Sequence, residues 1–179
     1  DAFMKDSVTQ LASACSSVVV MTKNSAKILK SAYGIQTHKV EVIQHGTHLV
    51  PHLNKESLKL KYGLQGKKVL STFGLLSSGK SIETTLDALP TIVKENPGVI
   101  FLVIGKTHPG VILSDGETYR NMLEAKVEKL GLQNYVKFIN YFLPLEDLLE
   151  YLQLSDIYLF TSNDPHQAVS GTFAYAMSC

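Results

Sequence analysis

The chain has 179 residues, of which 45% are apolar and 18% charged, and its formal net charge is +1. This length suits one domain, or one domain with part of another, that can bury a hydrophobic core. A charge so close to neutral provides no basic surface for a polyanion, so we expect no nucleic-acid partner. No apolar run reaches the length of a membrane-spanning helix, so we expect no integral membrane segment.

Two cysteines, Cys15 and Cys179, lie far apart in the sequence, and neither belongs to a C-x-x-C motif. No secretory signal pattern is present at the start of the chain. We therefore expect reduced thiols in a cytoplasmic protein, with a disulfide between the two residues as the alternative.

Short apolar runs alternate with helical patterns along the whole chain. Most of the runs are apolar without alternation, which is typical of buried parallel strands. The predicted strands are 17–22, 39–44, 68–73, 99–105, 135–140 and 156–161, and the predicted helices are 23–33, 55–62, 81–95, 117–131, 144–153 and 170–178. This regular alternation predicts an α/β protein with a doubly wound, Rossmann-like parallel sheet.

A domain boundary is expected near residues 46–55, where Gly46 and Pro51 interrupt regular structure. Residues 1–50 then form the tail of a preceding domain with its linker, and residues 51–179 form a second domain. No closing strand follows the last predicted helix, so we expect a fragment that is cut at both ends.

The stretch FGLLSSGKS matches G-x-x-x-x-G-K-S, the phosphate loop (P-loop) of nucleotide hydrolases, from Gly74 to Ser81. Such hydrolases also bind Mg²⁺, normally through an acidic residue at the end of a second strand. None of the predicted strands ends in Asp or Glu, and Asp156 begins its strand, at the wrong end of a parallel sheet. A P-loop hydrolase therefore stays one interpretation, and a plain glycine turn with a solvated Lys80 is another.

Three motifs in a fixed order resemble the donor-binding domain of B-type glycosyltransferases, in the glycogen-synthase-like group (family 4 type). The closest similarity is to a bacterial subfamily. The motifs are FGLLSxGK with Gly74 and Lys80, THPxV…GExYR from Thr107 to Arg120, and SGTxAYA from Ser170 to Ala176. The resemblance implies an incomplete B-type fold and a retaining, metal-independent transfer to a hydroxyl acceptor. The donor would be a UDP- or GDP-linked sugar and the acceptor a carbohydrate or a lipid-linked molecule, with no further cofactor.

The resemblance places the donor diphosphate at the segment Ser170-Gly171-Thr172 and at Lys80, which follows Gly74. A helix N-terminus with a lysine nearby can bind a diphosphate without a metal ion. In this segment Ser170 can cap the helix, Gly171 lets the diphosphate approach, and Thr172 adds a hydroxyl. An ordinary helix cap is the alternative explanation of the same three residues.

The resemblance also places the nucleotide base beside Asn140, Tyr141 and Phe142, mostly against backbone groups. Gln167 and Tyr175 stand where the wider group has two glutamates, which bind the donor sugar and the ribose. An amide can still bond sugar hydroxyls, because it both donates and accepts. Tyr175 cannot replace a carboxylate that accepts two ribose hydroxyls, so ribose recognition differs from the group's pattern.

Other polar residues have simpler interpretations. Thr107 and His108 follow the strand FLVIG at the ligand-facing end of the sheet, where His108 can contact a ligand or shape its loop. Glu117 and Arg120 lie three apart at a helix start and can pair with each other. We expect no metal site, because Gly46 and Pro51 interrupt the stretch that carries His45, His48 and His52.

The sequence thus predicts the donor domain of an enzyme, a hexosyltransferase of carbohydrate biosynthesis. Its partner would be the missing N-terminal domain of the same chain, which can also attach the protein peripherally to a membrane. We assign no catalytic residue and expect the fragment alone to be inactive. A non-catalytic nucleotide-sugar-binding domain is the alternative, followed by the P-loop hydrolase.

Overall fold

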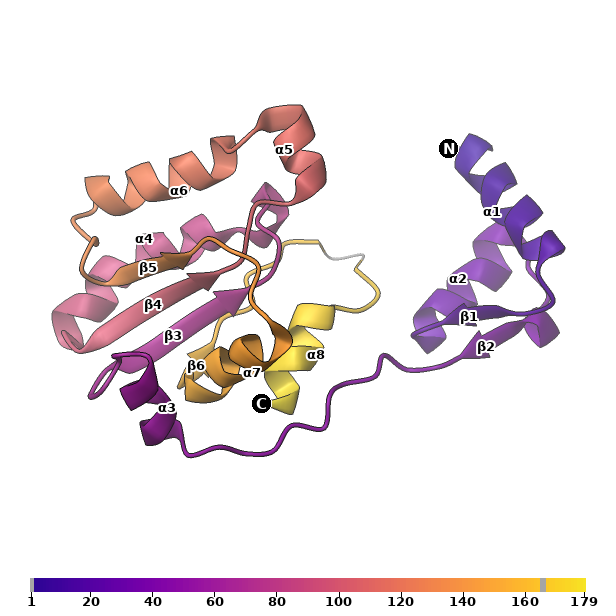
Figure 1. The fold of residues 1–179 in the computed structure, drawn as a ribbon. Coiled ribbons are helices and arrows are strands. Elements are labelled where there is room, and N and C mark those ends of the chain that lie inside the picture. Colours follow the sequence, from indigo (N-terminus) through magenta and orange to yellow (C-terminus); the bar gives the residue numbers. More distant parts are fainter. Residues whose placement is uncertain (1, 165–166) are drawn as a thin grey trace. The chain divides into compact units, whose positions relative to one another are not determined.

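The structure is a computed structural model that describes residues 2–164 and 167–179. Its contacts divide the described chain into two compact units (Figure 1). The first unit comprises residues 2–47 and 167–174, and the second comprises residues 48–164 and 175–179.

The first unit carries a small parallel sheet of two strands with two helices. Its elements are α1 (Ala2–Ala14), β1 (Val18–Val20), α2 (Lys23–Tyr33), the 3₁₀ turn η1 (Thr37–Lys39) and β2 (Val40–Val42). Helix α2 begins after Thr22, whose hydroxyl accepts a hydrogen bond from the Ser25 N–H, and ends at Gly34 with a φ of 70°. Both ends of α2 therefore carry the caps that helices favour.

The second unit is built on a parallel sheet of four strands in the order β5-β4-β3-β6. Its strands are β3 (Lys68–Phe73), β4 (Val99–Ile104), β5 (Val136–Ile139) and β6 (Ile157–Tyr158). Its helices are α3 (Lys55–Lys61), η2 (Ser78–Lys80), α4 (Ile82–Glu95), α5 (Pro109–Asp115), α6 (Thr118–Lys129) and α7 (Leu145–Leu154), and α8 (Gly171–Ser178) has residues in both units.

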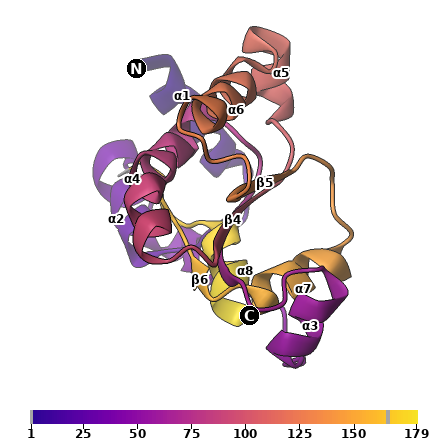
Figure 2. The same cartoon turned by 90° about the vertical axis from the view of Figure 1, so that its left-hand side faces the viewer.

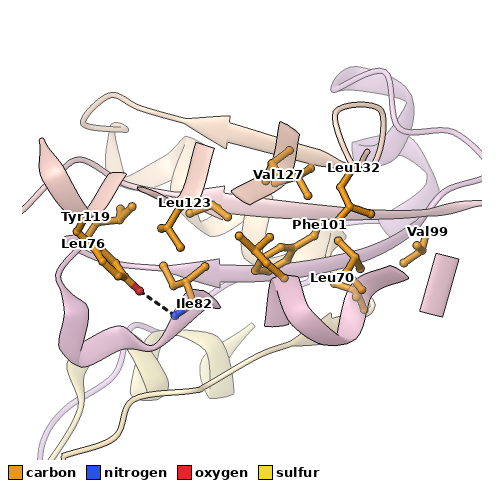
Figure 3. Packing of buried hydrophobic residues seen from close by; sticks show 13 residues of the cluster. Leu70, Leu76, Ile82, Val99, Phe101, Tyr119, Leu123, Val127 and Leu132 are labelled. Atoms are coloured by element: carbon orange, nitrogen blue, oxygen red, sulfur yellow. Dashed lines mark hydrogen bonds between the residues drawn. The ribbon is translucent and has the colours of Figure 1, made fainter. Parts of the chain in front are cut away.

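Helices cover both faces of the four-stranded sheet. Successive residues of a strand point to opposite faces, so Phe101 of β4 packs in one apolar cluster and Leu102 in the other. The first cluster takes side chains from α4 and α6, and Figure 3 shows its packing. The second takes side chains from α3 and α7, on the other side of the sheet (Figure 2). A sheet covered in this way is doubly wound.

The predicted α/β fold with parallel strands is confirmed. Every predicted strand and helix has a counterpart, although the six strands form two sheets and β6 is only two residues long. Two helices, α1 and α5, were not predicted. The large apolar side chains of α1, Phe3, Met4 and Leu11, are exposed. Within the described residues, no helix is long and apolar enough to cross a membrane.

Candidate functional site

The strand order of the second unit reverses at β3. The chain passes from β3 to β4 and β5 on one side and returns to β6 on the other side of β3. In open parallel sheets, ligands bind outside the carboxyl ends of the strands at such a switch point. The loops that follow β3 and β6 therefore border the candidate site, and the first of them is the glycine-rich stretch from Gly74 to Ser81.

Two glycines bring the backbones after β3 and β4 together. Gly74 and Gly105 have φ angles of 133° and 130°, which side-chain-bearing residues rarely adopt. A Cβ atom on Gly105 would lie 2.2 Å from the carbonyl oxygen of Gly74. Only glycine fits at Gly105, and the sequence signal for it was a glycine placed directly after a buried strand.

Backbone pairing continues beyond the ends of these two strands. The Leu76 N–H donates to the carbonyl of Lys106 at 2.8 Å, and the His108 N–H donates to the carbonyl of Leu76 at 2.9 Å. The Leu76 side chain is buried in the core. The first half of the glycine-rich loop is thus fixed against the loop after β4.

The second half of the loop is a tight turn, η2, followed directly by α4. The Lys80 and Ser81 N–H groups donate to the carbonyls of Ser77 and Ser78, each at 3.0 Å. Ser81 has a φ of 47°, and the next N–H, of Ile82, donates to the hydroxyl of Tyr119 at 2.9 Å. Three successive N–H groups are therefore already paired within the protein.

Lys80 is half-buried, and its backbone is held from the loop after β6. The Thr161 hydroxyl donates to the Lys80 carbonyl at 2.7 Å, and the Asn163 N–H donates to the Gly79 carbonyl at 3.2 Å. Burial lowers the pKa of the Lys80 ammonium below its usual value. In the part of the chain that the structure describes, no carboxylate pairs with this ammonium. The ammonium is therefore a half-buried cation that can receive an anionic ligand.

The residues of the THPxV…GExYR motif join the loop after β4 to helix α6. The Thr107 hydroxyl donates to the Glu117 carboxylate, and Glu117 lies 3.4 Å from Nε of Arg120, so the predicted pairing of Glu117 with Arg120 is confirmed. Arg120 is buried and donates through Nη2 to the Gly105 carbonyl at 2.8 Å. Nδ1 of His108 accepts from the Gly110 N–H at 3.0 Å. His108 therefore shapes its loop, and a ligand contact for it stays a prediction.

The proposed base loop, Asn140 to Phe142, follows β5 at the same edge of the sheet. Tyr141 and Phe142 are 53% and 82% exposed. Burial, together with a hydrogen bond and the charge of Tyr141, raises the pKa of Tyr151 to about 12. Tyr141 therefore lies near Tyr151 of α7, while the Phe142 ring is exposed. Contact of this loop with a base stays a prediction.

In the first unit, Ser170 caps helix α8. Its hydroxyl accepts from the Phe173 N–H at 3.3 Å and lies 3.0 Å from the Thr172 hydroxyl. A Cβ atom on Gly171 would lie 3.5 Å from Nε2 of His45. Gln167 is exposed. Because these residues belong to the first unit and Lys80 to the second, their expected convergence on one diphosphate stays a prediction.

Tyr175, in the second unit, packs against residues from distant parts of the chain. Its hydroxyl lies 2.8 Å from Nε2 of His48, and its ring contacts those of His48 and Phe73 at centroid distances of 4.8 and 6.0 Å. The hydroxyl at this proposed ribose position is therefore already bonded to a histidine of the linker. Among the described side chains, no group of three or more His, Cys, Asp or Glu residues is arranged to hold a metal ion.

The family follows from a comparison with known proteins. The model of the family described as "Glycosyl transferases group 1" matches residues 54–177. The chain belongs to this family. The matched range runs from the residue before α3 almost to the end of α8, so it includes both glycine loops and all four strands of the larger sheet.

Two curated proteins are similar over much of the chain. Mannosylfructose-phosphate synthase of Agrobacterium fabrum is 24% identical over 155 residues, which are 83% of this chain and 33% of that protein. Alpha-monoglucosyldiacylglycerol synthase of Streptococcus pneumoniae is 28% identical over 160 residues, 85% of this chain and 34% of that protein. The chain thus spans about a third of the length of the curated relatives it matches.

Solved structures share the fold. HepE of Anabaena, in complex with UDP and glucose, aligns with a TM-score of 0.77 at 22% identity, over 100% of this chain and 47% of that one. Sucrose-phosphate synthase of Thermosynechococcus elongatus aligns with a TM-score of 0.78 at 18% identity, over 100% and 42% of the two chains. The group 1 chain therefore has part of the B-type, Rossmann-like glycosyltransferase fold.

Proposed function

We propose that the chain is the donor-binding part of a retaining glycosyltransferase, which transfers a sugar from a UDP- or GDP-linked donor to a hydroxyl acceptor. The observation that carries this proposal is Lys80, a half-buried cation without a carboxylate partner among the described residues, at the switch point of a group 1 glycosyltransferase sheet. A UDP-bound and glucose-bound structure of HepE, which shares the fold, supports a UDP-linked donor.

The proposed mechanism is electrostatic. As the bond between the sugar and the diphosphate breaks, negative charge builds up on the leaving diphosphate. A preorganised cation stabilises that charge without reorganising, and such stabilisation is usually the largest contribution to catalysis. Lys80 would supply the cation, and the capped helix end at Ser170, Gly171 and Thr172 would supply N–H groups and hydroxyls. No step requires a metal ion.

The hydrogen bonds of the glycine-rich loop argue against a P-loop hydrolase. A P-loop surrounds the phosphates with free backbone N–H groups, whereas the N–H groups of Lys80, Ser81 and Ile82 already donate to protein acceptors. Asp156 lies at the amino end of β6, where it accepts hydrogen bonds from Lys59 and from the Val69 N–H. Its carboxylate is therefore engaged at the opposite edge of the sheet from the loop.

A non-catalytic nucleotide-sugar-binding domain is the second candidate. One observation favours it: the two positions expected to carry glutamates hold Gln167 and Tyr175, and the Tyr175 hydroxyl is bonded to His48. Both candidates share the donor site, so nucleotide binding tests them together. Sugar release from a UDP-sugar separates them, because only an enzyme consumes the donor.

Calorimetric titration with UDP and GDP tests the proposed site. We expect metal-indifferent binding that is unchanged in EDTA, with no preference for a triphosphate and no hydrolysis. Lys80→Ala should weaken binding by roughly 1.5–3 kcal/mol, because a charge-assisted bond to the diphosphate is lost. Ser81→Ala should have almost no effect, because no metal ion needs its hydroxyl.

Lys94→Ala is the matched control, since it removes an exposed lysine in the last turn of α4, the helix that follows Lys80. It should leave the affinity unchanged. If EDTA or Ser81→Ala abolishes binding, or if a triphosphate binds clearly more tightly, the P-loop interpretation is correct and the proposal is wrong.

A further inference from the structure

The motif THPxV…GExYR contains a tyrosine, Tyr119, whose hydroxyl reaches another helix. Tyr119 lies in the first turn of α6 and is buried in the first apolar cluster, beside Leu76 and Ile82 (Figure 3). Its hydroxyl accepts from the Ile82 N–H at 2.9 Å and donates to a Glu83 carboxylate oxygen at 2.5 Å. The dashed line in Figure 3 marks the first of these bonds. The core thus places a polar group at the start of α4.

The start of α4 needs this partner. The first N–H groups of a helix have no acceptor within the helix, and a side chain at the N-cap position normally supplies one. Here Ser81 occupies that position but makes no side-chain cap bond. Instead, Tyr119 accepts from Ile82, the first residue of α4, across 37 positions of sequence. Tyr119 of α6 therefore caps the neighbouring helix, α4.

Ser81 is the residue between Lys80 and this cap, and its backbone is strained. A φ of 47° is a left-handed conformation that costs a side-chain-bearing residue free energy. Such a conformation persists only where the surroundings fix it from both sides. Its own N–H is held by the Ser78 carbonyl, and the N–H that follows it is held by Tyr119. The Ser81 carbonyl also accepts from the Thr84 N–H within α4 at 3.2 Å. Loss of the Tyr119 bond would leave the Ile82 N–H unpaired and remove the contact that fixes the start of α4 from another helix.

Relaxation at Ser81 would turn the residue before it. Lys80 is joined directly to Ser81, and its carbonyl is held by the Thr161 hydroxyl. The Lys80 carbonyl is held without Tyr119, whereas the backbone on the other side of Ser81, at Ile82, is held by Tyr119. We propose that Tyr119 is a positioning residue for Lys80, whose hydroxyl locks Ile82 and Ser81 so that the Lys80 ammonium is held ready for the donor diphosphate. This inference rests on the proposed function.

The chemistry of the hydroxyl suits this role over a wide pH range. Burial, together with the bond to Glu83, raises the pKa of Tyr119 above its usual value. The hydroxyl therefore stays protonated at neutral pH, and it can donate to Glu83 while it accepts from Ile82. Glu83 orients the Tyr119 hydroxyl, so it contributes to the same positioning of Lys80.

A double-mutant cycle on the full chain tests the inference, with UDP as the probe in calorimetric titration. Tyr119→Phe keeps the ring in the core and removes only the hydroxyl. We expect it to weaken UDP binding about fivefold, which corresponds to one neutral hydrogen bond. In the Lys80→Ala background, the same substitution should cause no further loss, since the residue it positions is gone.

Two controls separate positioning from general loosening. Tyr135→Phe removes the hydroxyl of a tyrosine that packs against the same cluster, and that hydroxyl has no hydrogen-bond partner among the described residues. It should leave UDP affinity unchanged. Leu123→Val trims a buried side chain of α6 and lowers the melting temperature without touching the hydroxyl. It should not weaken UDP binding.

The outcomes are distinct. If Tyr119→Phe weakens binding equally with and without Lys80, or if Leu123→Val weakens it as much at a similar melting temperature, the inference is wrong while the proposed function stands. If the unsubstituted chain binds neither UDP nor GDP, both the proposed function and the inference are wrong. If Tyr119→Phe does not fold, Glu83→Ala replaces it in the same cycle, because it removes the acceptor that orients the hydroxyl.

Discussion

Gly105 is the residue on which the close approach of the two glycine-bearing loops depends. We predict that Gly105→Ala lowers the free energy of unfolding by roughly 2–4 kcal/mol, since it adds overpacking to backbone strain. The physical reason is the 2.2 Å separation between the new Cβ atom and the Gly74 carbonyl, combined with a φ of 130°. Urea denaturation measures this loss directly.

Gly66→Ala is the matched control for Gly105→Ala. Gly66 also has a positive φ, of 68°, but a Cβ atom there would meet nothing within 4 Å. Its substitution reports the conformational strain alone, which we expect to cost about 1 kcal/mol. Equal losses for the two variants would show that the contact with Gly74 has no energetic consequence.

The sequence predicted Lys80 and its glycines but none of the residues that hold them. A short sequence pattern can predict a turn, because the glycines and the lysine occupy fixed positions within the pattern. The contact between Thr161 and Lys80 joins residues 81 positions apart, and the one between Tyr119 and Ile82 joins residues 37 apart. Such contacts depend on strand order, which one sequence alone does not reveal.

Asp156 joins three elements at the amino edge of the four-stranded sheet. Its carboxylate accepts from Nζ of Lys59 on α3 and from the Val69 N–H on β3, each at 2.8 Å, and it directly precedes β6. Burial alone would raise the pKa of Asp156, but the bonds from Lys59 and Val69 outweigh it and hold the pKa below its usual value. The ionised carboxylate is therefore more stable in the folded protein than in the unfolded chain.

We predict that Asp156→Asn lowers the free energy of unfolding at pH 7 by about 3 kcal/mol, because it removes the close, partly buried carboxylate partner of the buried Lys59. The other carboxylate near Lys59 belongs to Glu56, which is exposed and 3.8 Å away. A lowered folded pKa means that this contribution is complete above the unfolded value of about 4 and is lost as the pH falls through the folded pKa. The difference in the free energy of unfolding between the unsubstituted chain and Asp156→Asn should therefore stay constant from pH 7 to about pH 4 and vanish at lower pH. Urea denaturation at several pH values measures this difference.

The exposed pair of Asp87 and Lys126 provides the comparison for Asp156. Its closest oxygen and nitrogen atoms are 2.7 Å apart, but Asp87 lies on the surface, where water screens the pair. Asp87→Asn should cost less than 1 kcal/mol at pH 7. A loss as large as that of Asp156→Asn would contradict the role we give to burial.

Hydrophobic periodicity in the sequence predicted the helices that pack against the four-stranded sheet, but it did not predict α5, which has no buried residue. Helix α4 carries Ile82, Leu86 and Leu89 on its buried face, and this stripe was visible in the sequence. Helix α5 is a seven-residue turn with no buried residue, so its sequence contained no stripe to detect. The strand β6 has only two residues, although the predicted run spans 156–161, and Ile157 and Phe160 of that run are 49% and 42% exposed.

The two units of the chain differ greatly in their cores. The second unit contains both apolar clusters around the four-stranded sheet. Among residues 2–47, only Ala12 and Ile35 are buried, and the β1 and β2 side chains Val19 and Val42 are 56% and 41% exposed. Since burial of apolar surface is the main favourable contribution to folding, the stability of the chain should reside in the second unit.

We predict that a peptide of residues 1–47 does not fold by itself, whereas residues 48–179 unfold cooperatively. A two-stranded sheet with almost no buried side chains cannot compensate for the lost conformational entropy of 47 residues. Circular dichroism during urea titration distinguishes the two cases. The peptide should lose its signal gradually, and the longer segment should show a sigmoidal transition at the same midpoint as the full chain. A cooperative transition of the peptide would contradict the argument, because it would require a core that the described residues 2–47 do not contain.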